Sequence, residues 1–348
     1  MSNIPRKEYP RPQFVRENWM NLNGTWAFEI DNGRSGEARG LQKVGTALSG
    51  EITVPFCPES ELSGVQHTDF MYGVWYKRTV TVTEKQLKGR AVLHFGAVDY
   101  CAKVFVNGKL AGTHKGGYVS FEFDVTALLK AGENEIAVYA EDNTRDRLIP
   151  SGKQSEQYNS YGCFYTRTTG IWQTVWLEPV ASSHITSIKA IPNIDNGVMS
   201  VTVGACSDSP VSDIVEVSLL DKGQVVATAK GVQGTELRLA VQNPTLWEPS
   251  NPYLYDMKVS LSKNGKKVDE VKSYTAFRKI SAERDANGIM RMRLNNKNLF
   301  QYGPLDQGWW PDGLYTAPTD EALLYDIVKT KAWGFNMIRK HVKVEPAR

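Results

Sequence analysis

The chain has 348 residues, of which 41% are hydrophobic and 23% charged, and this length predicts two domains plus a remainder rather than one small domain. The composition is that of a folded globular protein and excludes a disordered chain. Lysine and arginine number 41 against 38 aspartates and glutamates, and no block of five like charges occurs, so the charge pattern that marks a nucleic-acid-binding protein or a basic membrane arm is missing.

The N-terminal sequence has no apolar run behind its charged residues, and no apolar stretch of about 18 residues follows later. We therefore expect a soluble protein with no membrane partner. Its compartment stays open between the cytoplasm and, if a leader has been removed, the periplasm or the medium. The cysteines (Cys57, Cys101, Cys163 and Cys206) are far apart and form no CxxC pair, so we expect buried free thiols rather than a zinc site or a disulfide framework.

The first part of the chain alternates apolar and polar residues with a period of two, which indicates strands. We expect strands over 74–82, 90–98, 102–112, 120–125 and 134–141. Asn-Gly dipeptides, which tolerate the positive φ of tight hairpins, recur along the chain. They begin at Asn23, Asn32, Asn107, Asn196, Asn264 and Asn287. Many short strands without βαβ alternation predict an antiparallel jelly-roll sandwich over residues 1–182.

A second series of short alternating segments follows this sandwich. We expect strands over 200–205, 214–220, 224–230, 236–241, 254–261 and 268–277. About seven short strands within 100 residues are typical of an immunoglobulin-like sandwich, although the cysteine and tryptophan spacing of antibody domains is missing. We assign this second domain to residues 183–280.

The pattern changes after Lys279. We expect a strand over 298–303, a helix over 320–333 that ends before Gly334, and a strand over 335–339. Four apolar residues share one face of this helix. They are Leu323, Leu324, Ile327 and Val328. Because a (β/α)₈ barrel needs about 200 residues or more, residues 281–348 are interpreted as the first βα unit of a truncated barrel. The alternative is an irregular appendage packed on the sandwiches.

Several segments, in chain order, match the motifs of one enzyme family. They are RENWMNLNGTWAFEID, VPFCPES, YGVWYKRTVTV, HFGAVDYCAKVFVNGKLAGTHKGGYVSFEFDVT, CFYTRTTGIWQTVWLEPV, LWEPSNPYLYDMKVSL, AFRKI, LNNKNLFQYG and GFNMIRKH. On these segments the chain resembles glycoside hydrolase family 2, the β-galactosidase and β-glucuronidase family, over nearly its whole length.

This resemblance implies a jelly-roll sugar-binding domain, an immunoglobulin-like domain and a catalytic (β/α)₈ barrel. Its members are retaining glycosidases, which use two carboxylates about 5 to 5.5 Å apart. Both glutamates are implied to lie beyond the segment equivalent to Arg348, so no catalytic residue is assigned here, and Glu345 is interpreted as a solvated carboxylate. The chain is then the N-terminal fragment of a β-glycosidase, inactive by itself, with a β-linked glycoside as its partner. Homo-oligomers are consistent with the family, and no cofactor is implied.

The sequence departs from the family motif at the end of the first barrel strand. Asp306 and Gln307 replace an Arg-His pair, and Trp309 and Trp310 follow. We expect the two polar side chains to hydrogen-bond sugar hydroxyls and the tryptophans to stack on a sugar face. The alternative is a loop packed against the sandwich.

Other candidate substrate-binding residues lie at the second barrel strand and in a sandwich loop. Arg339 aligns with the family pattern, whereas His341 comes one residue early, and both belong to the strand end where barrels gather functional groups. A core or capping role is the alternative for His341. The loop that often carries an acid in the family has none here, which leaves Tyr165 and Arg167 as its polar candidates; for Arg167 a bracing role is favoured.

The sequence gives little support for a metal site or a nucleotide-binding site. The histidines at 67, 94, 114 and 184 show no paired metal-ligand spacing, and Gly116-Gly117 lacks the Lys-Ser/Thr of a phosphate-binding loop. Two rival interpretations remain open: a non-catalytic carbohydrate-binding module, since jelly rolls also serve as lectins, and a structural surface protein.

Overall fold

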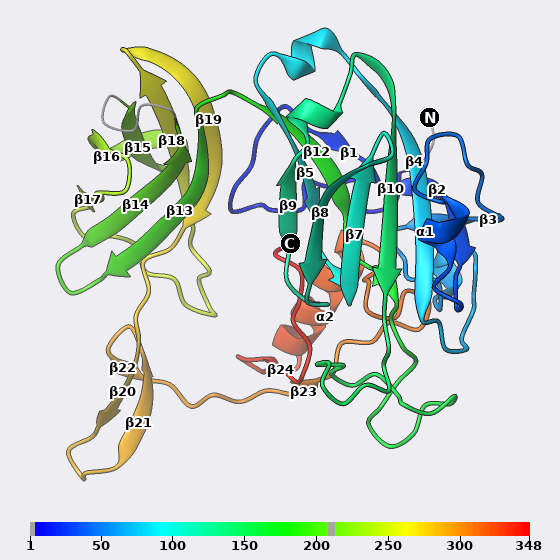
Figure 1. Cartoon of the computed structure of the whole chain (residues 1–348). Coiled ribbons are helices and arrows are strands. Elements are labelled where there is room, and N and C mark those ends of the chain that lie inside the picture. The colour runs from blue at the N-terminus through cyan, green and yellow to red at the C-terminus, as the bar shows by residue number, and fades with distance from the viewer. Residues whose placement is uncertain (1–3, 208–212) are drawn as a thin grey trace.

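The computed structural model describes residues 4–207 and 213–348. The predicted fold class is confirmed, because the chain is mainly β and forms sandwiches. Figure 1 shows the strands up to β12 gathered on one side and those from β13 to β19 on the other, with the tail returning beneath the first group.

The first sandwich pairs a six-stranded sheet, in the order β3-β2-β4-β10-β7-β8, with a four-stranded sheet, β1-β12-β5-β9, beside a small β11-β6 pair. The strands are β1 Met20–Asn21, β2 Gly24–Ile30, β3 Gly50–Val54, β4 Gly73–Val82, β5 Arg90–Phe95, β6 Val98–Asp99, β7 Cys101–Val106, β8 Lys109–Lys115, β9 Phe121–Asp124, β10 Gly132–Glu141, β11 Gly170–Ile171 and β12 Val175–Val180; the short helix α1 spans Gly36–Arg39. Alternate side chains such as Trp26, Tyr76 and Val104 form one core between the sheets. Burial of each such side chain stabilises the fold by about 1.5–3 kcal/mol.

Asn-Gly turns set the register of two hairpins. Asn107 and Gly108 have φ angles of 51° and 77°, so the segment predicted as one strand over 102–112 is the β7–β8 hairpin instead. Asn264 and Gly265, at 50° and 74°, connect β18 and β19 in the same way. A turn with two positive φ angles matches the twist of the flanking strands, which explains why this dipeptide occurs there.

The second sandwich packs a three-stranded sheet, β13-β14-β17, against a four-stranded sheet, β16-β15-β18-β19. Its strands are β13 His184–Asn193, β14 Val198–Cys206, β15 Asp213–Asp221, β16 Gln224–Val232, β17 Glu236–Ala240, β18 Tyr255–Lys263 and β19 Lys266–Thr275. The burial pattern alternates along β15 and β18, so one face of each strand enters a separate core that contains Val217, Val259 and Phe277.

A buried charge network connects the two sandwiches. Arg16 is 7% exposed and forms ion pairs with Glu178 on β12 at 3.2 Å and with Asp269 on β19 at 2.8 Å. The same guanidinium donates to the carbonyl oxygen of Ile185 at 2.6 Å. The N-terminal segment therefore lies at the junction between the two sandwiches and contacts both of them through Arg16.

The tail forms a β-hairpin sheet, β20-β21-β22, and then a parallel pair, β23-β24. The elements are β20 Ile280–Arg284, β21 Met290–Leu294, β22 Lys297–Asn298, β23 Leu305–Asp306, α2 Asp320–Ala332 and β24 Arg339–Lys340. The predicted strands over 298–303 and 335–339 are wrong in extent, since the ladder begins only at residue 305 and Pro304 supplies no backbone N–H. Asn336 bridges part of the gap, because its side chain bonds the backbone of Phe300 and Tyr302 at 2.9 Å each.

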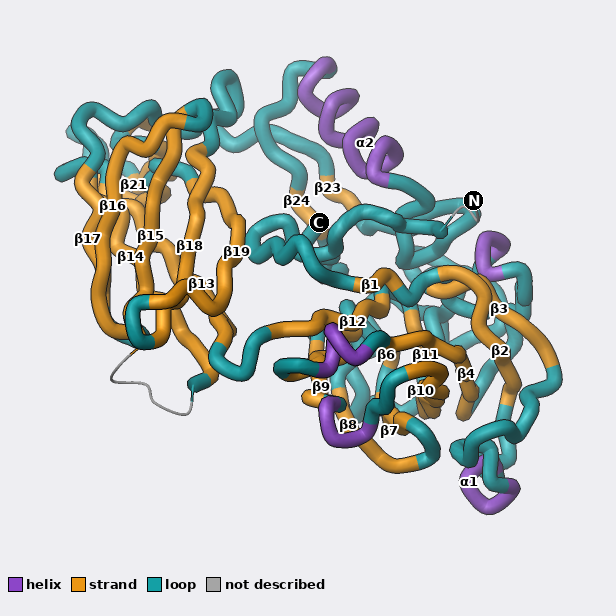
Figure 2. Tube along the Cα trace, turned by 90° about the horizontal axis from the view of Figure 1, so that it is seen from above, coloured by secondary structure: helices purple, strands orange, loops and turns teal. Residues whose placement is uncertain are grey.

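Helix α2 begins at the predicted residue and ends one residue before the predicted end. Thr319 is its N-cap and accepts a hydrogen bond from the backbone N–H of Ala322 at 3.1 Å, and Gly334 follows it with a φ of 87°. The predicted apolar face is not a buried one, however: Leu324, Ile327 and Val328 are each more than half exposed. In Figure 2 the helix lies at the edge of the molecule, away from both sandwiches.

The cysteines differ in burial. All four are free thiols, but Cys57 alone is buried, whereas Cys163 is exposed and Cys101 and Cys206 are intermediate. The expectation of four buried thiols is therefore wrong, because Cys163 lies in an exposed loop outside both cores. Across residues 4–207 and 213–348, neither helix has the length and apolar character needed to span a bilayer.

Candidate functional site

The carboxyl ends of β23 and β24 meet a loop that leaves the first sandwich after β10. In the parallel register Leu305 pairs with Arg339 and Asp306 with Lys340, so both strands end at the same edge. Residues 142–169 form the long loop between β10 and β11. Loop and strand ends are far apart in sequence, and the tertiary structure brings them together.

Tyr165 carries the contact between the loop and the first of these strands. Its hydroxyl donates a hydrogen bond to Oε1 of Gln307, and its ring lies 4.8 Å from that of Trp309, centroid to centroid. The indole N–H of Trp309 donates to the carbonyl oxygen of Thr166 at 3.2 Å. Three of the predicted site residues therefore form one contact cluster.

A cavity of about 580 Å³ opens beside this cluster, between the end of β23 and helix α2. Polar and aromatic side chains from the loop, the strand end and the helix line it: Tyr165, Asp306, Gln307, Trp309, Asp326 and Trp333. Its size suits a small ligand, and aromatic rings beside amide and carboxylate groups are the combination that binds sugars. Four of the eight predicted residues line this cavity.

The Asp306 carboxylate is already engaged. Its Oδ2 pairs with the ammonium of Lys340 at 2.7 Å, and its Oδ1 accepts the backbone N–H of Gly308 at 2.7 Å. Burial lowers the pKa of Lys340, but hydrogen bonds to Asp306 and Glu345 outweigh it and raise that pKa. Asp306 is therefore a hydrogen-bond acceptor that the neighbouring lysine positions.

The interpretation of Glu345 as a solvated carboxylate is wrong. The carboxylate lies 2.7 Å from Lys340 Nζ and 3.4 Å from Lys343 Nζ. Lys343 is buried and donates to the carbonyl oxygen of Gly308 at 2.5 Å, and burial lowers its pKa. Nothing in the sequence singles out Lys343, which lies between the exposed Val342 and Val344 and is buried only because the tail folds back on residue 308.

Arg167 braces the loop and does not reach the cavity, as the favoured interpretation expected. It is fully buried, donates to the carbonyl oxygens of Ser155 at 3.1 Å and Gln157 at 2.5 Å, and also donates to that of Thr68. Its guanidinium lies 4.1 Å from the centroid of the Phe70 ring, and burial lowers its pKa. It positions the segment that carries Tyr165.

The remaining candidates lie outside the lining of this cavity. Trp310 exchanges backbone hydrogen bonds with Leu314 at 2.9 and 3.1 Å. Arg339 and His341 extend the parallel ladder through their backbone N–H groups, which donate to Pro304 and Asp306. The residue after His341, Val342, approaches the sandwich loop, since a Cβ on Gly152 would lie 3.2 Å from its carbonyl oxygen.

Three buried carboxylates behind the loop were missed by the sequence analysis. They are Glu59, Asp99 and Asp142, each at most 4% exposed. Burial raises the pKa of all three; for Asp142, burial followed by the charge of Glu59 raises the pKa to about 7. Gln154 donates to Asp99 at 2.7 Å, so the cluster holds the same loop from its inner side.

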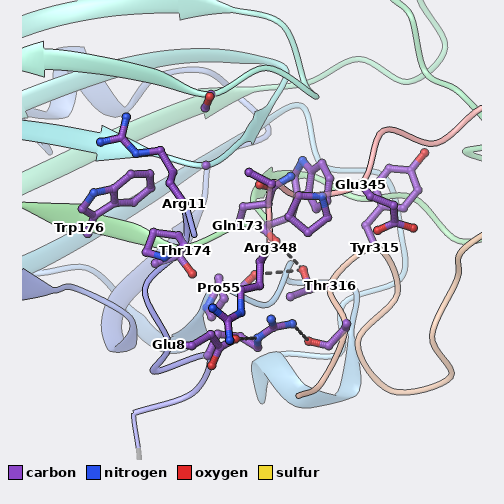
Figure 3. Close-up of a pocket in the computed structure, with 18 of the residues that line it drawn as sticks. Glu8, Arg11, Pro55, Gln173, Thr174, Trp176, Tyr315, Thr316, Glu345 and Arg348 are labelled. Atoms are coloured by element: carbon purple, nitrogen blue, oxygen red, sulfur yellow. Dashed lines mark hydrogen bonds and ion pairs between the residues drawn. The ribbon is translucent and has the colours of Figure 1, made fainter. Parts of the chain in front are cut away.

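A second cavity, of about 340 Å³, lies where the two ends of the chain meet the first sandwich (Figure 3). Aromatic side chains form much of its wall, namely Tyr118, Trp172, Trp176 and Tyr315. Its arginines are paired: Arg6 and Arg348 with Asp320, and Arg11 with Glu178 at 3.2 Å. These satisfied charges are typical of a packed junction rather than of a site for a charged ligand.

Metal ligands do not gather in the part of the chain that the structure describes, where no three His, Cys, Asp or Glu side chains are placed to hold an ion. His94, for example, stacks on Trp176 with centroids 4.7 Å apart and contacts Glu122 at 2.9 Å. His94 is therefore a buried side chain that packs against an aromatic ring and contacts a carboxylate.

Known proteins share this organisation. The family profile described as "Glycosyl hydrolases family 2, sugar binding domain" matches residues 42–166, and "Glycosyl hydrolases family 2" matches 183–278, together more than half of the chain. A β-galactosidase of Thermoanaerobacter pseudethanolicus is 27% identical over 285 residues, which cover 78% of this chain and 36% of that protein. A β-glucuronidase of Paenibacillus borealis is 27% identical, over 79% of this chain and 48% of its own.

Solved structures show the same fold. A β-glucuronidase from Lactobacillus rhamnosus superposes with a TM-score of 0.77 at 25% identity and covers 95% of this chain and 55% of its own. A β-glucuronidase from Ruminococcus gnavus, at 19% identity, gives 0.77 over 97% of this chain and 57% of its own. The chain thus spans about half the length of these proteins, or less.

Proposed function

Because the chain belongs to family 2 of the glycosyl hydrolases, we propose that it is the N-terminal portion of a retaining β-glycosidase that hydrolyses O-glycosidic bonds of carbohydrates. Its relatives include β-galactosidases and β-glucuronidases. In this proposal residues 1–348 bind and orient the sugar, while the acid/base and nucleophilic glutamates come from later barrel strands. The described chain then does not hydrolyse glycosides by itself.

One observation carries the proposal: the sandwich loop lends Tyr165 to the end of β23. The hydrogen bond from Tyr165 to Gln307 and the ring contact with Trp309 build one wall of a cavity from two parts of the chain. An aromatic ring beside fixed amide and carboxylate acceptors offers a sugar both a stacking face and hydroxyl partners. The C-terminal end of a barrel strand is also where barrel enzymes place functional groups.

The domain boundaries form part of this proposal: a jelly-roll sugar-binding domain over 1–182, an immunoglobulin-like domain over 183–280 and the start of a catalytic barrel over 281–348. The exposed apolar face of α2 supports the barrel, because a βα unit of a parallel sheet buries that face only against neighbouring units. The parallel register of β23 and β24 on either side of the helix is the arrangement that such a unit requires.

The proposal is tested by sugar binding and by hydrolysis with the purified chain. We expect a panel of β-glycosides to change the tryptophan fluorescence, and this change to be lost in Trp309→Phe but kept in Trp247→Phe, a half-buried tryptophan on the second sandwich. Nitrophenyl β-glycosides should remain uncleaved.

The outcomes separate the rival functions. Hydrolysis that co-purifies with the chain and disappears on mutation of Asp306 or Glu345 would contradict the proposed division of labour. Binding that survives Trp309→Phe would move the sugar site elsewhere and favour a carbohydrate-binding module. Absence of any binding across the panel would overturn the proposal.

A further inference from the structure

Phe70 contacts two arginine side chains of the loop that carries Tyr165. The guanidinium carbon of Arg145 lies 3.6 Å from the centroid of the Phe70 ring, and that of Arg167 lies 4.1 Å from it. Arg145 belongs to the start of the loop 142–169 and Arg167 to its end, whereas Phe70 precedes β4 of the same sandwich. In Figure 1 the loop is the green segment that projects below β10. The ring therefore connects both ends of this loop.

The two guanidiniums carry like charges. Burial and the positive charge of Arg145 both lower the pKa of Arg167, while the carboxylates of Glu59 and Asp69 oppose this shift. The face of an aromatic ring carries partial negative charge and attracts a cation within about 6 Å of its centroid. Both guanidiniums meet this condition. The Phe70 ring therefore stabilises two like charges that lie close together.

The same two guanidiniums bind one turn of the loop. Arg145 donates from Nε to the carbonyl oxygen of Glu156 at 3.2 Å. Arg167 donates to the carbonyl oxygens on either side of it, at 3.1 Å for Ser155 and 2.5 Å for Gln157. Three consecutive carbonyl groups are therefore bound by the pair of cations over the ring.

This turn is bonded to the backbone of Tyr165. The N–H of Ser155 donates to the carbonyl oxygen of Tyr165 at 2.7 Å. The Tyr165 side chain contacts Gln307 and Trp309 at the cavity beside β23, whereas Phe70 lies outside the lining of that cavity. A continuous series of contacts therefore leads from Phe70 to the cavity wall.

Phe14 offers a comparison, because two arginines also lie over its ring. Arg11 and Arg16 are 5.1 and 5.0 Å from its centroid, but both form ion pairs with carboxylates at the junction of the sandwiches. Arg145 and Arg167 instead donate to backbone carbonyl groups, which carry no net charge and attract a cation less strongly. The ring that these two share therefore contributes more to their placement.

We propose that Phe70 is a positioning residue for the sugar site and that it acts through Tyr165. Its ring holds the two guanidiniums, the guanidiniums hold the turn at 155–157, and the turn holds the backbone of Tyr165. This inference rests on the proposed function and adds to it a residue that determines sugar affinity from outside the cavity.

Fluorescence titration of the full chain with a panel of methyl β-glycosides, the glucoside, galactoside and glucuronide, tests the inference. Phe70→Leu removes the aromatic face and keeps an apolar side chain, so it should lower the affinity by roughly 3- to 10-fold, the equivalent of one hydrogen bond at the cavity. Phe70→Tyr keeps the ring and should retain the affinity. Phe14→Leu, the matched control, should leave it unchanged.

A double substitution separates positioning from a general loss of structure. In the Tyr165→Ala chain the contact at the cavity is already lost, so adding Phe70→Leu should change the affinity by less than about twofold. Tryptophan emission without sugar gives a second readout, because Tyr165 contacts Trp309. Phe70→Leu should change this emission, but not in a Trp309→Phe chain. If Phe70→Leu fails to fold, Arg145→Met, at a half-buried side chain, takes its place with the same expected results.

The outcomes that contradict the inference are distinct. An unchanged affinity in Phe70→Leu overturns it and leaves the proposed function intact. A loss of affinity that is equally large in the Tyr165→Ala chain, or that Phe70→Tyr does not restore, also overturns it. If Tyr165→Ala abolishes binding, the emission of Trp309 decides. If no glycoside of the panel binds to the unmodified chain, the proposed function fails, and the emission still tests the link between Phe70 and Tyr165.

Discussion

The hydroxyl of Tyr165 donates a hydrogen bond to Oε1 of Gln307 across 142 residues of sequence. Tyr165 belongs to the loop between β10 and β11 of the first sandwich, and Gln307 directly follows β23. A side chain of the sandwich therefore fixes the orientation of an amide at the strand end. Through this contact, the sandwich loop positions a side chain that lines the cavity at the end of β23.

Tyr165→Phe removes that hydrogen bond and keeps the ring against Trp309. Because the amide of Gln307 is then free to rotate, we expect sugar affinity to fall by roughly 3- to 10-fold, the equivalent of one neutral hydrogen bond. Fluorescence titration measures the affinity. Tyr158→Phe, at an exposed tyrosine of the same loop, should bind like the unmodified chain, and an unchanged affinity in Tyr165→Phe would contradict the positioning role.

Arg16→Ala should strongly destabilise the chain. Glu178 keeps its ion pair with Arg11, but Asp269 loses the ion pair with Arg16, and loss of one partner from a buried pair costs about 3–5 kcal/mol. Chemical denaturation monitored by circular dichroism measures the free energy of unfolding. Arg238→Ala, an exposed arginine 3.8 Å from Glu236, should change it by less than about 1 kcal/mol. Equal effects of the two substitutions would show that the junction does not depend on Arg16.

Asp142 should make stability fall as pH rises. Its pKa in the folded chain is about 7, above the unfolded value near 3.9, so the folded chain binds this proton more tightly. The resulting stabilisation is complete below pH about 4 and is lost as pH approaches 7, on the order of 2 kcal/mol between pH 5 and 8.

Asp142→Asn should therefore reduce the loss of unfolding free energy between pH 5 and pH 8, measured by denaturation at both values. Glu156→Gln, at an exposed carboxylate of the same loop, should leave it unchanged. If Asp142→Asn shows the same pH dependence as the unmodified chain, the proton resides elsewhere in the cluster.

Gly117→Ala should destabilise the wall behind the sandwich loop. A Cβ at Gly117 would lie 2.3 Å from Oδ1 of Asp99, a buried atom that cannot move into solvent. Overpacking of this kind costs about 1–3 kcal/mol. Gly50→Ala, whose Cβ would lie 3.6 Å from the carbonyl oxygen of Phe28, is the matched control in thermal denaturation. Equal melting temperatures for the two variants would contradict the close contact.

Much of the fold follows from local pattern. Strand alternation predicted β4, β10, β15 and β18 within a few residues, and the helical spacing of apolar residues followed by Gly334 predicted α2 to within one residue. These features were accessible because each depends on residues close together in the chain. The strand predicted over 298–303 was wrong because a strand also needs a partner, and here the ladder forms only at 305–306.

The sequence by itself determined the mainly β class, the position of the helix, the family resemblance and the candidate residues at the two strand ends. Only the tertiary structure decided which of them meet: Tyr165 contacts Gln307, Arg167 turns inward to backbone carbonyls, and Glu345 pairs with two lysines. The physical reason is that burial and charge pairing depend on how the chain folds back on itself, and for Tyr165 and Gln307 on two segments 142 positions apart, and no local pattern records such proximity.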